Sequence, residues 1–172
     1  ENAQAIAHIC HRLDGLPLAL ELAAARTKIL PAHAILSQLT DRLTFLARHS
    51  ADVPARHRSL RAAIEWSYNL LDEDEQQLFS RLALFADGFT PQAVTAILFG
   101  RPNPGPGQVD WEVMGQITRL LDKNMIYRVV AGDGAEESRF AMLTTLQAFA
   151  LEKLAQETGV DVLRGRYVEF YA

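Results

Sequence analysis

Hydrophobic positions recur every three to four residues along most of the chain, and this spacing is typical of helices that bury one face. Residues that cap or break helices bound each of these stretches. We therefore predict helices over about residues 1–13, 34–46, 60–71, 90–99, 110–124 and 145–156, with further helices beginning at Pro17, Asp72 and Val160.

The periodicity changes to that of strands in one region. The stretches from Met125 to Val130 and from Ser138 to Met142 are predicted to be two short strands, and Ala131 to Gly134 between them has the composition of a hairpin turn. Three helices followed by such a hairpin is the order of a winged helix. The predicted fold class is therefore mainly α, with a helical lobe followed by a winged-helix domain that carries a small β-hairpin.

The polar stretch from Ser50 to Arg58 contains a proline and has no periodicity, so we predict a linker there. The expected organisation is a helical lobe over residues 1–55, a winged-helix domain over residues 56–158 and the start of a following helical region over residues 159–172. Because the first residue is Glu1 and helical patterns reach both ends, we expect the chain to be a piece of a longer protein.

Composition narrows the class of protein. The 172 residues are 49% hydrophobic and carry a formal net charge of −4, as expected for a mildly acidic globular domain. Cys10 is the only cysteine, so no disulfide can form within the chain. No apolar run approaches the roughly 20 residues that span a bilayer, and no signal peptide is recognisable. We expect a cytoplasmic protein without membrane contact.

The sequence contains no complete catalytic or metal site. Gly100 and Gly105 have the glycine spacing of a phosphate-binding P-loop, but Pro106 and Gly107 stand where that loop needs lysine and then serine or threonine. The cluster His8–His11 offers too few ligands for tetrahedral zinc. We therefore expect this segment to have no catalytic residue and no metal, and not to be an enzyme by itself.

The distribution of charge argues against contact with DNA. Between Asp72 and Thr158 the chain has 13 acids and 7 bases, and the candidate recognition helix over residues 110–124 has three acids and two bases. Binding to a duplex needs clustered lysine and arginine. We do not expect DNA contact, and a DNA-binding winged helix of a transcription factor is the alternative hypothesis.

Two further features leave alternatives open. The basic residues between Arg56 and Arg61 form either a solvated linker or a contact for an acidic partner or a nucleotide phosphate. Trp66, Tyr68 and Trp111 could anchor a protein interface, because aromatic residues favour interfaces. At these positions we expect a role in the core instead.

The segment GLPLALELAAAR, from Gly15 to Arg26, places two helix-breaking residues inside an apolar helical pattern. Glycine tolerates the left-handed conformation that follows a helix end, and proline fits the first turn of a helix, where no N–H is needed. Gly15 is therefore predicted to close one helix and Pro17 to open the next.

Three blocks of the sequence resemble one family. GLPLAL, from Gly15 to Leu20, resembles the GLPL motif of the NB-ARC class of STAND ATPases. RHRSLRAAIEWSYNLLDEDEQQLFSRLALFADGFT, from Arg56 to Thr90, resembles the winged-helix entry of bacterial members, among them large transcriptional regulators of the SARP and LuxR types. RFAMLTTLQAFALEKL, from Arg139 to Leu154, resembles the end of that winged helix. The chain is thus similar to the fragment that holds the helical ARC lobe and the winged-helix domain.

The resemblance implies a nucleotide-dependent switch. Pro17 would lie against the adenine of bound ADP or ATP, and Gly15 and Leu16 would shape the turn. In the parent protein an upstream P-loop domain of the same chain would hold the phosphates and Mg²⁺, and tetratricopeptide-type repeats would follow downstream. The winged helix would control autoinhibition and activation according to the nucleotide bound.

One position departs from the family pattern. Many members carry Met-His-Asp near the end of the winged helix, where the histidine reaches the ADP phosphate. Met142 matches the first position, but Leu143 and Thr144 replace the histidine and the aspartate. Leucine cannot donate a hydrogen bond, so we expect Leu143 and Leu146 to pack into the core.

Overall fold

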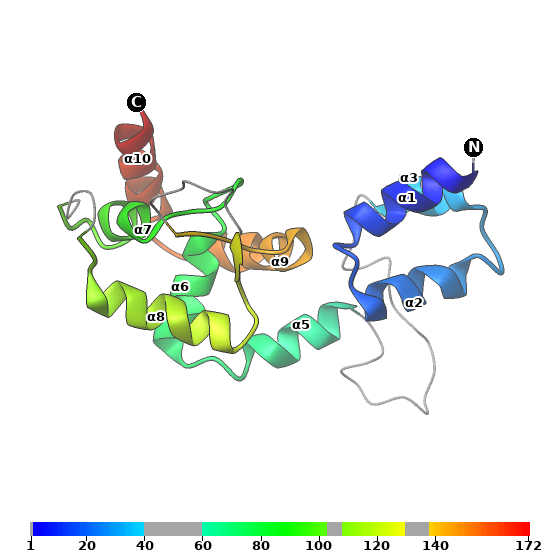
Figure 1. The fold of residues 1–172 in the computed structure, drawn as a ribbon, viewed down its shortest axis with the longest axis horizontal. Coiled ribbons are helices and arrows are strands. Elements are labelled where there is room, and N and C mark those ends of the chain that lie inside the picture. The colour runs from blue at the N-terminus through cyan, green and yellow to red at the C-terminus, as the bar shows by residue number, and fades with distance from the viewer. Residues whose placement is uncertain (1, 40–59, 103–107, 130–137) are drawn as a thin grey trace. The chain divides into compact units, whose positions relative to one another are not determined.

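The computed structural model describes residues 2–39, 60–102, 108–129 and 138–172. Within these residues the chain is mainly helical with one small β-hairpin, which confirms the predicted fold class (Figure 1). The chain forms two compact units, Glu1–Leu70 and Leu71–Ala172. The expected domain boundary between residues 55 and 56 and the predicted linker lie outside the described residues.

The first unit contains four described helices, α1 (Asn2–Arg12), α2 (Pro17–Arg26), α3 (Ala32–Gln38) and α5 (Leu60–Tyr68). Helices α1 and α3 pack against each other, and Nη1 of Arg12 donates a hydrogen bond to the carbonyl oxygen of Leu36 over 3.2 Å. The apolar residues buried in this unit are Ala5, Ile9, Leu13, Ala19, Leu22, Ala23, Ile35, Leu39, Leu60 and Ile64. The predicted helix over residues 34–46 is described only as far as residue 39.

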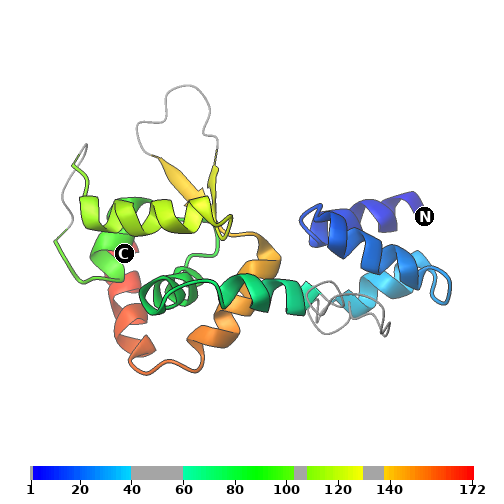
Figure 2. The same cartoon turned by 90° about the horizontal axis from the view of Figure 1, so that it is seen from below.

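The second unit has the expected order of three helices, a hairpin and further helices. Its elements are α6 (Glu73–Leu82), α7 (Pro91–Ile97), α8 (Trp111–Asp122), β1 (Tyr127–Val129), β2 (Arg139–Ala141), α9 (Thr144–Leu154) and α10 (Val160–Tyr171). The two strands are antiparallel, with Arg128 opposite Phe140, and they follow the C-terminal end of α8 (Figure 2). The predicted turn between the strands lies outside the described residues.

A third extended segment, which the sequence did not reveal, attaches the hairpin to the chain between α6 and α7. Phe89 forms a β-bridge with Phe140, and the two backbones exchange hydrogen bonds of 2.8 and 2.9 Å. Gly88 makes this approach possible, because its φ is +87° and a Cβ there would lie 2.5 Å from the carbonyl oxygen of Phe140. A single bridged residue has no periodicity, so pattern analysis could not find it.

Aromatic rings connect the elements of the second unit. Phe85 lies 5.5 Å from Phe89 and 5.7 Å from Tyr167, measured between ring centroids, and Phe89 stacks on Phe140 at 6.1 Å. Because Tyr167 belongs to α10, and α10 packs against α7, the last helix shares the core of this unit. Among the described residues, no helix combines the length and apolar character needed to cross a membrane.

The helix starts that the sequence predicted are confirmed. Asp72 and Glu75 form the expected capping box, in which each side chain accepts a hydrogen bond of 2.9 Å from the backbone amide of the other. The side chains of Thr90 and Asp110 cap α7 and α8. These caps satisfy backbone amides that have no partner within the helix.

Candidate functional site

The Gly15–Pro17 turn connects α1 and α2 through two left-handed residues. Asp14 has a φ of +54° and Gly15 a φ of +66°. The amide of Asp14 donates to the carbonyl of His11 over 3.2 Å, and the amide of Gly15 donates to that of Cys10 over 3.0 Å. This pair of bonds is a Schellman ending, in which the first left-handed residue is Asp14 rather than the expected glycine. Gly15, which is also left-handed, continues the reversal of chain direction after α1.

Pro17 opens α2 at its first position, as predicted. Leu16 before it is extended, with φ −63° and ψ 121°, and its carbonyl accepts the first helical hydrogen bond, from the amide of Leu20 over 2.9 Å. Pro17 and Gly15 are exposed and Leu16 is half-buried, whereas Ala19 on the same helix is fully buried. Buried residues of α2 therefore anchor the turn to the core, while Pro17 is exposed to solvent.

The second candidate element, Met142–Thr144, links β2 to α9. Leu143 is the N-cap residue of α9, and its side chain makes no capping hydrogen bond. Met142 and Leu143 are half-buried and Thr144 is exposed, whereas Leu146 is buried as expected. Leu143 therefore enters the core only in part. Gly15–Pro17 belongs to the first unit and Met142–Thr144 to the second, so the two elements are separate candidate sites.

A buried carboxylate, which sequence analysis treated only as a cap, joins α6 to α8. The side chain of Glu75 is only 2% exposed and pairs with Nζ of Lys123, while Nε of Arg119 lies 3.6 Å from its other oxygen. Arg119 and Lys123 are the two basic residues of the predicted recognition helix. Both pair with an internal acid, which reduces the charge that they can offer to a DNA phosphate, although each side chain stays partly exposed.

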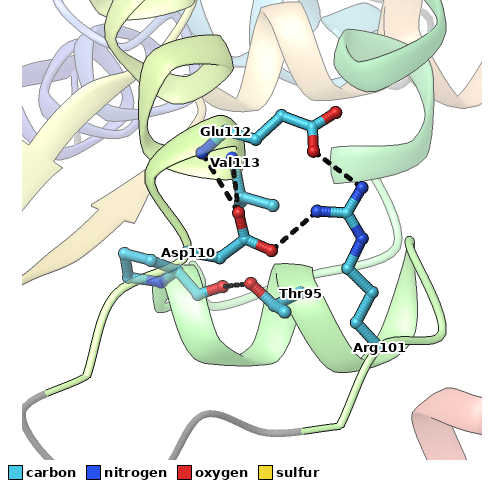
Figure 3. Close-up of polar contacts among 6 residues, drawn as sticks. Thr95, Arg101, Asp110, Glu112 and Val113 are labelled. Atoms are coloured by element: carbon cyan, nitrogen blue, oxygen red, sulfur yellow. Dashed lines mark hydrogen bonds and ion pairs between the residues drawn. The ribbon is translucent and has the colours of Figure 1, made fainter.

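Arg101, which follows α7, pairs with two acids at the start of α8 (Figure 3). Its Nη1 lies 2.8 Å from Oδ2 of Asp110, and its Nη2 lies 2.8 Å from Oε2 of Glu112. The other oxygen of Asp110 accepts the amides of Glu112 and Val113 over 3.1 and 3.3 Å. The hydrogen bond from Arg101 lowers the pKa of the Asp110 carboxyl, although partial burial opposes this effect, and the backbone amides lower it further. Asp110 therefore both caps α8 and holds Arg101.

The expected burial of the tryptophans was wrong. The side chain of Trp111, at the start of α8, is 81% exposed, and that of Trp66, on α5, is 51% exposed, while Tyr68 is half-buried. In the parts of the chain that the structure describes, no three His, Cys, Asp or Glu side chains come together as a metal site. Cys10 is a half-buried free thiol.

Comparison with known proteins places the chain within larger relatives. No protein-family model matches it. Over 171 residues, 99% of the chain, it is 40% identical to the protein named "Putative HTH-type transcriptional regulator Rv0890c" of Mycobacterium tuberculosis, of which it covers 18%. A Mycobacterium bovis protein of the same description, Mb0914c, gives the same values.

A second group of relatives is shorter. The chain is 34% identical over 170 residues to "Uncharacterized protein Rv0894" of Mycobacterium tuberculosis, and it covers 41% of that protein. It thus spans less than half the length of the relatives it matches. The chain is homologous to a segment of large mycobacterial proteins that are named as HTH-type transcriptional regulators.

Proposed function

We propose that this chain is the regulatory segment of a STAND-type ATPase that acts as a transcriptional or signalling regulator. The helical lobe forms the adenine side of a nucleotide site whose phosphate-binding part, a P-loop domain with Mg²⁺, lies upstream in the parent chain. The winged helix changes between two arrangements according to whether ADP or ATP is bound. This segment supplies no catalytic residue, so any hydrolysis by the parent depends on the P-loop domain.

The observation that carries this proposal is the exposed proline on an anchored turn. Pro17 is exposed at the first position of α2, while Ala19 and Leu22 of the same helix are buried. An exposed ring on a rigid helix start is suited to stacking on a planar base, because it loses little conformational entropy on binding. The match to segments of much longer relatives supports a role within a multidomain chain.

The winged helix acts in this proposal through protein contacts. The names of the relatives favour a transcriptional role for the parent, and they leave open which segment contacts DNA. Because Arg119 and Lys123 face Glu75, we assign DNA binding to another part of the parent chain. With Leu143 in place of a hydrogen-bonding histidine, the winged helix responds to nucleotide through packing rather than through a direct phosphate contact. Nucleotide then shifts the population of the two arrangements by its difference in affinity for them.

The test is the nucleotide content of the natural full-length protein. The protein is purified, denatured, and assayed for released ADP and ATP, beside the variants Pro17→Ala and Pro31→Ala. Pro31 is the matched control, because it is also an exposed proline at a helix start of the same unit, that of α3. We expect bound adenine nucleotide that falls in Pro17→Ala and stays unchanged in Pro31→Ala.

Two results contradict parts of the proposal. If the protein contains no nucleotide and takes up neither ADP nor ATP, the nucleotide switch is wrong. If nucleotide content is equal in all three proteins, the switch stands but Pro17 is not the adenine contact.

A further inference from the structure

A cavity of about 270 Å³ lies within the second unit, between α6, α8 and the residues that follow α7. Asp74, Gln77, Leu78 and Arg81 line it from α6 and share one face of that helix, because their spacing is three to four residues. The cavity opens next to the Arg101 ion pairs of Figure 3, since Arg101 and Glu112 form part of its wall.

The wall contains two buried leucines and three polar side chains that have no partner among the described residues. Leu78 is 4% exposed and Leu98 is 5% exposed, and both line the cavity. Within the described part of the chain, the side chains of Asp74, Gln77 and Gln116 make no hydrogen bond or ion pair. The cavity thus offers one carboxylate and two amides beside a small apolar surface.

The charges at the cavity favour a cation. Each arginine in the wall is already neutralised: Nε of Arg81 lies 3.0 Å from Glu157, and Arg101 pairs with Asp110 and Glu112. The wall itself contains two carboxylates, Asp74 and Glu112, and two guanidinium groups. Glu157 and Asp110, which pair with these arginines without lining the cavity, add two more negative charges. An anion would meet this excess of negative charge, whereas a cation would be attracted by it.

The size of the cavity favours one side chain rather than a whole small molecule. Pockets for drug-sized ligands have volumes of about 300 to 1,000 Å³, and this cavity lies at the lower edge of that range. We propose that it binds a basic side chain, arginine or lysine, presented on the surface of a protein partner. The aliphatic stem lies on Leu78 and Leu98, and the charged end meets the carboxylate of Asp74 and the amide oxygens of Gln77 and Gln116.

The experiment is a titration of the ¹⁵N-labelled 172-residue chain with the tripeptide acetyl-Gly-Arg-Gly-amide, followed by NMR. The side-chain amide signals of Gln77 and Gln116 report directly on the cavity. We expect both signals to shift with the arginine peptide and to stay in place with acetyl-Gly-citrulline-Gly-amide, which has nearly the same shape and no charge. The variant Asp74→Asn should weaken binding about threefold, as expected for an exposed ion pair.

Glu73→Gln is the matched control, because Glu73 occupies the same turn of α6 and does not line the cavity. It should bind the arginine peptide as the wild type does. The proposal is overturned if neither glutamine signal moves, if the citrulline peptide binds equally well, or if Glu73→Gln weakens binding as much as Asp74→Asn. It is also overturned if agmatine, which has the guanidinium without a peptide backbone, binds more tightly than the peptide, because the site would then serve a small cation.

Discussion

The carboxylate of Glu75, at the start of α6, pairs with the ammonium group of Lys123, which follows α8 and lies 48 residues away in the sequence. Glu75 also accepts the backbone amide of Asp72, so one buried side chain completes a helix cap and joins two helices. The stability of the second unit and the charge available on α8 both depend on this residue.

Replacing Glu75 by glutamine should destabilise the second unit by about 2 kcal/mol. The amide keeps the shape of the side chain but loses the charge-assisted hydrogen bonds, and buried bonds of this kind contribute more than neutral ones. Lys123 is 39% exposed, so water compensates for part of the loss. Urea denaturation followed by circular dichroism measures the difference. Glu73→Gln, an exposed acid in the same turn, should change stability by less than about 0.5 kcal/mol. Equal losses in both variants would mean that the general charge of the helix start matters rather than the Glu75 pairs.

The chain should bind duplex DNA neither tightly nor in a salt-dependent manner. Arg119 and Lys123 are directed to Glu75, and the region from Asp72 to Thr158 has 13 acids against 7 bases. Even nonspecific binders lose affinity steeply as salt rises, because they release counterions from the phosphates. Fluorescence anisotropy with a labelled duplex at low salt checks this expectation. Salt-dependent binding that disappears in Lys123→Ala, in a variant that is still folded, would restore the DNA-binding hypothesis.

The local features of the fold could be predicted because each depends on residues close together in the sequence. Short-range chemistry predicts the capping box of Asp72 and Glu75, the Thr90 cap and the start of α2 at Pro17. The order of helices and strands in the second unit then follows from these signals and from periodicity.

The contacts that build the sites could not be predicted, because they join residues that are distant in the sequence. The pairing of Glu75 with Lys123 and that of Arg101 with Asp110 and Glu112 need the tertiary fold. The exposure of Trp111 was missed for a related reason. An aromatic residue in an apolar pattern does not reveal which side of the helix its neighbours cover.

Gly88→Ala should destabilise the second unit by about 3 kcal/mol. Its φ of +87° strains any residue with a side chain, and the added Cβ would meet the carbonyl oxygen of Phe140 at 2.5 Å. The bridge between Phe89 and Phe140 would have to open to admit it. Gly165→Ala is the opposite control, because Gly165 lies inside α10 and, apart from its chain neighbours and the helix's own backbone, no atom lies within 4 Å of its added Cβ. This substitution should stabilise the second unit by about 0.7 kcal/mol. Thermal or urea denaturation measures the stability of each variant. If Gly88→Ala is more stable than the wild type, the close approach of Gly88 to the Phe89–Phe140 bridge is contradicted.

The Asp110 carboxyl should titrate below its ordinary pKa of 3.8, because Arg101 donates a hydrogen bond to its charged form. A pKa that is lower in the folded than in the unfolded state stabilises the fold above the unfolded value, and this stability is lost as the pH falls through the folded value. The stability difference between wild type and Asp110→Asn should therefore be constant above about pH 5 and shrink in more acidic solution.

Carboxyl ¹³C NMR measures the Asp110 pKa directly. In Arg101→Gln it should rise toward 3.8, because the guanidinium that stabilises the carboxylate is gone, while the backbone amides of Glu112 and Val113 still hold it partly down. Arg164→Gln is the control, since Arg164 is exposed and pairs with Asp161 of its own helix over 3.8 Å. It should leave the Asp110 pKa where it is. An Asp110 pKa that is unchanged in Arg101→Gln would mean that the cap alone lowers it, and Arg101 would then have no part in holding the start of α8.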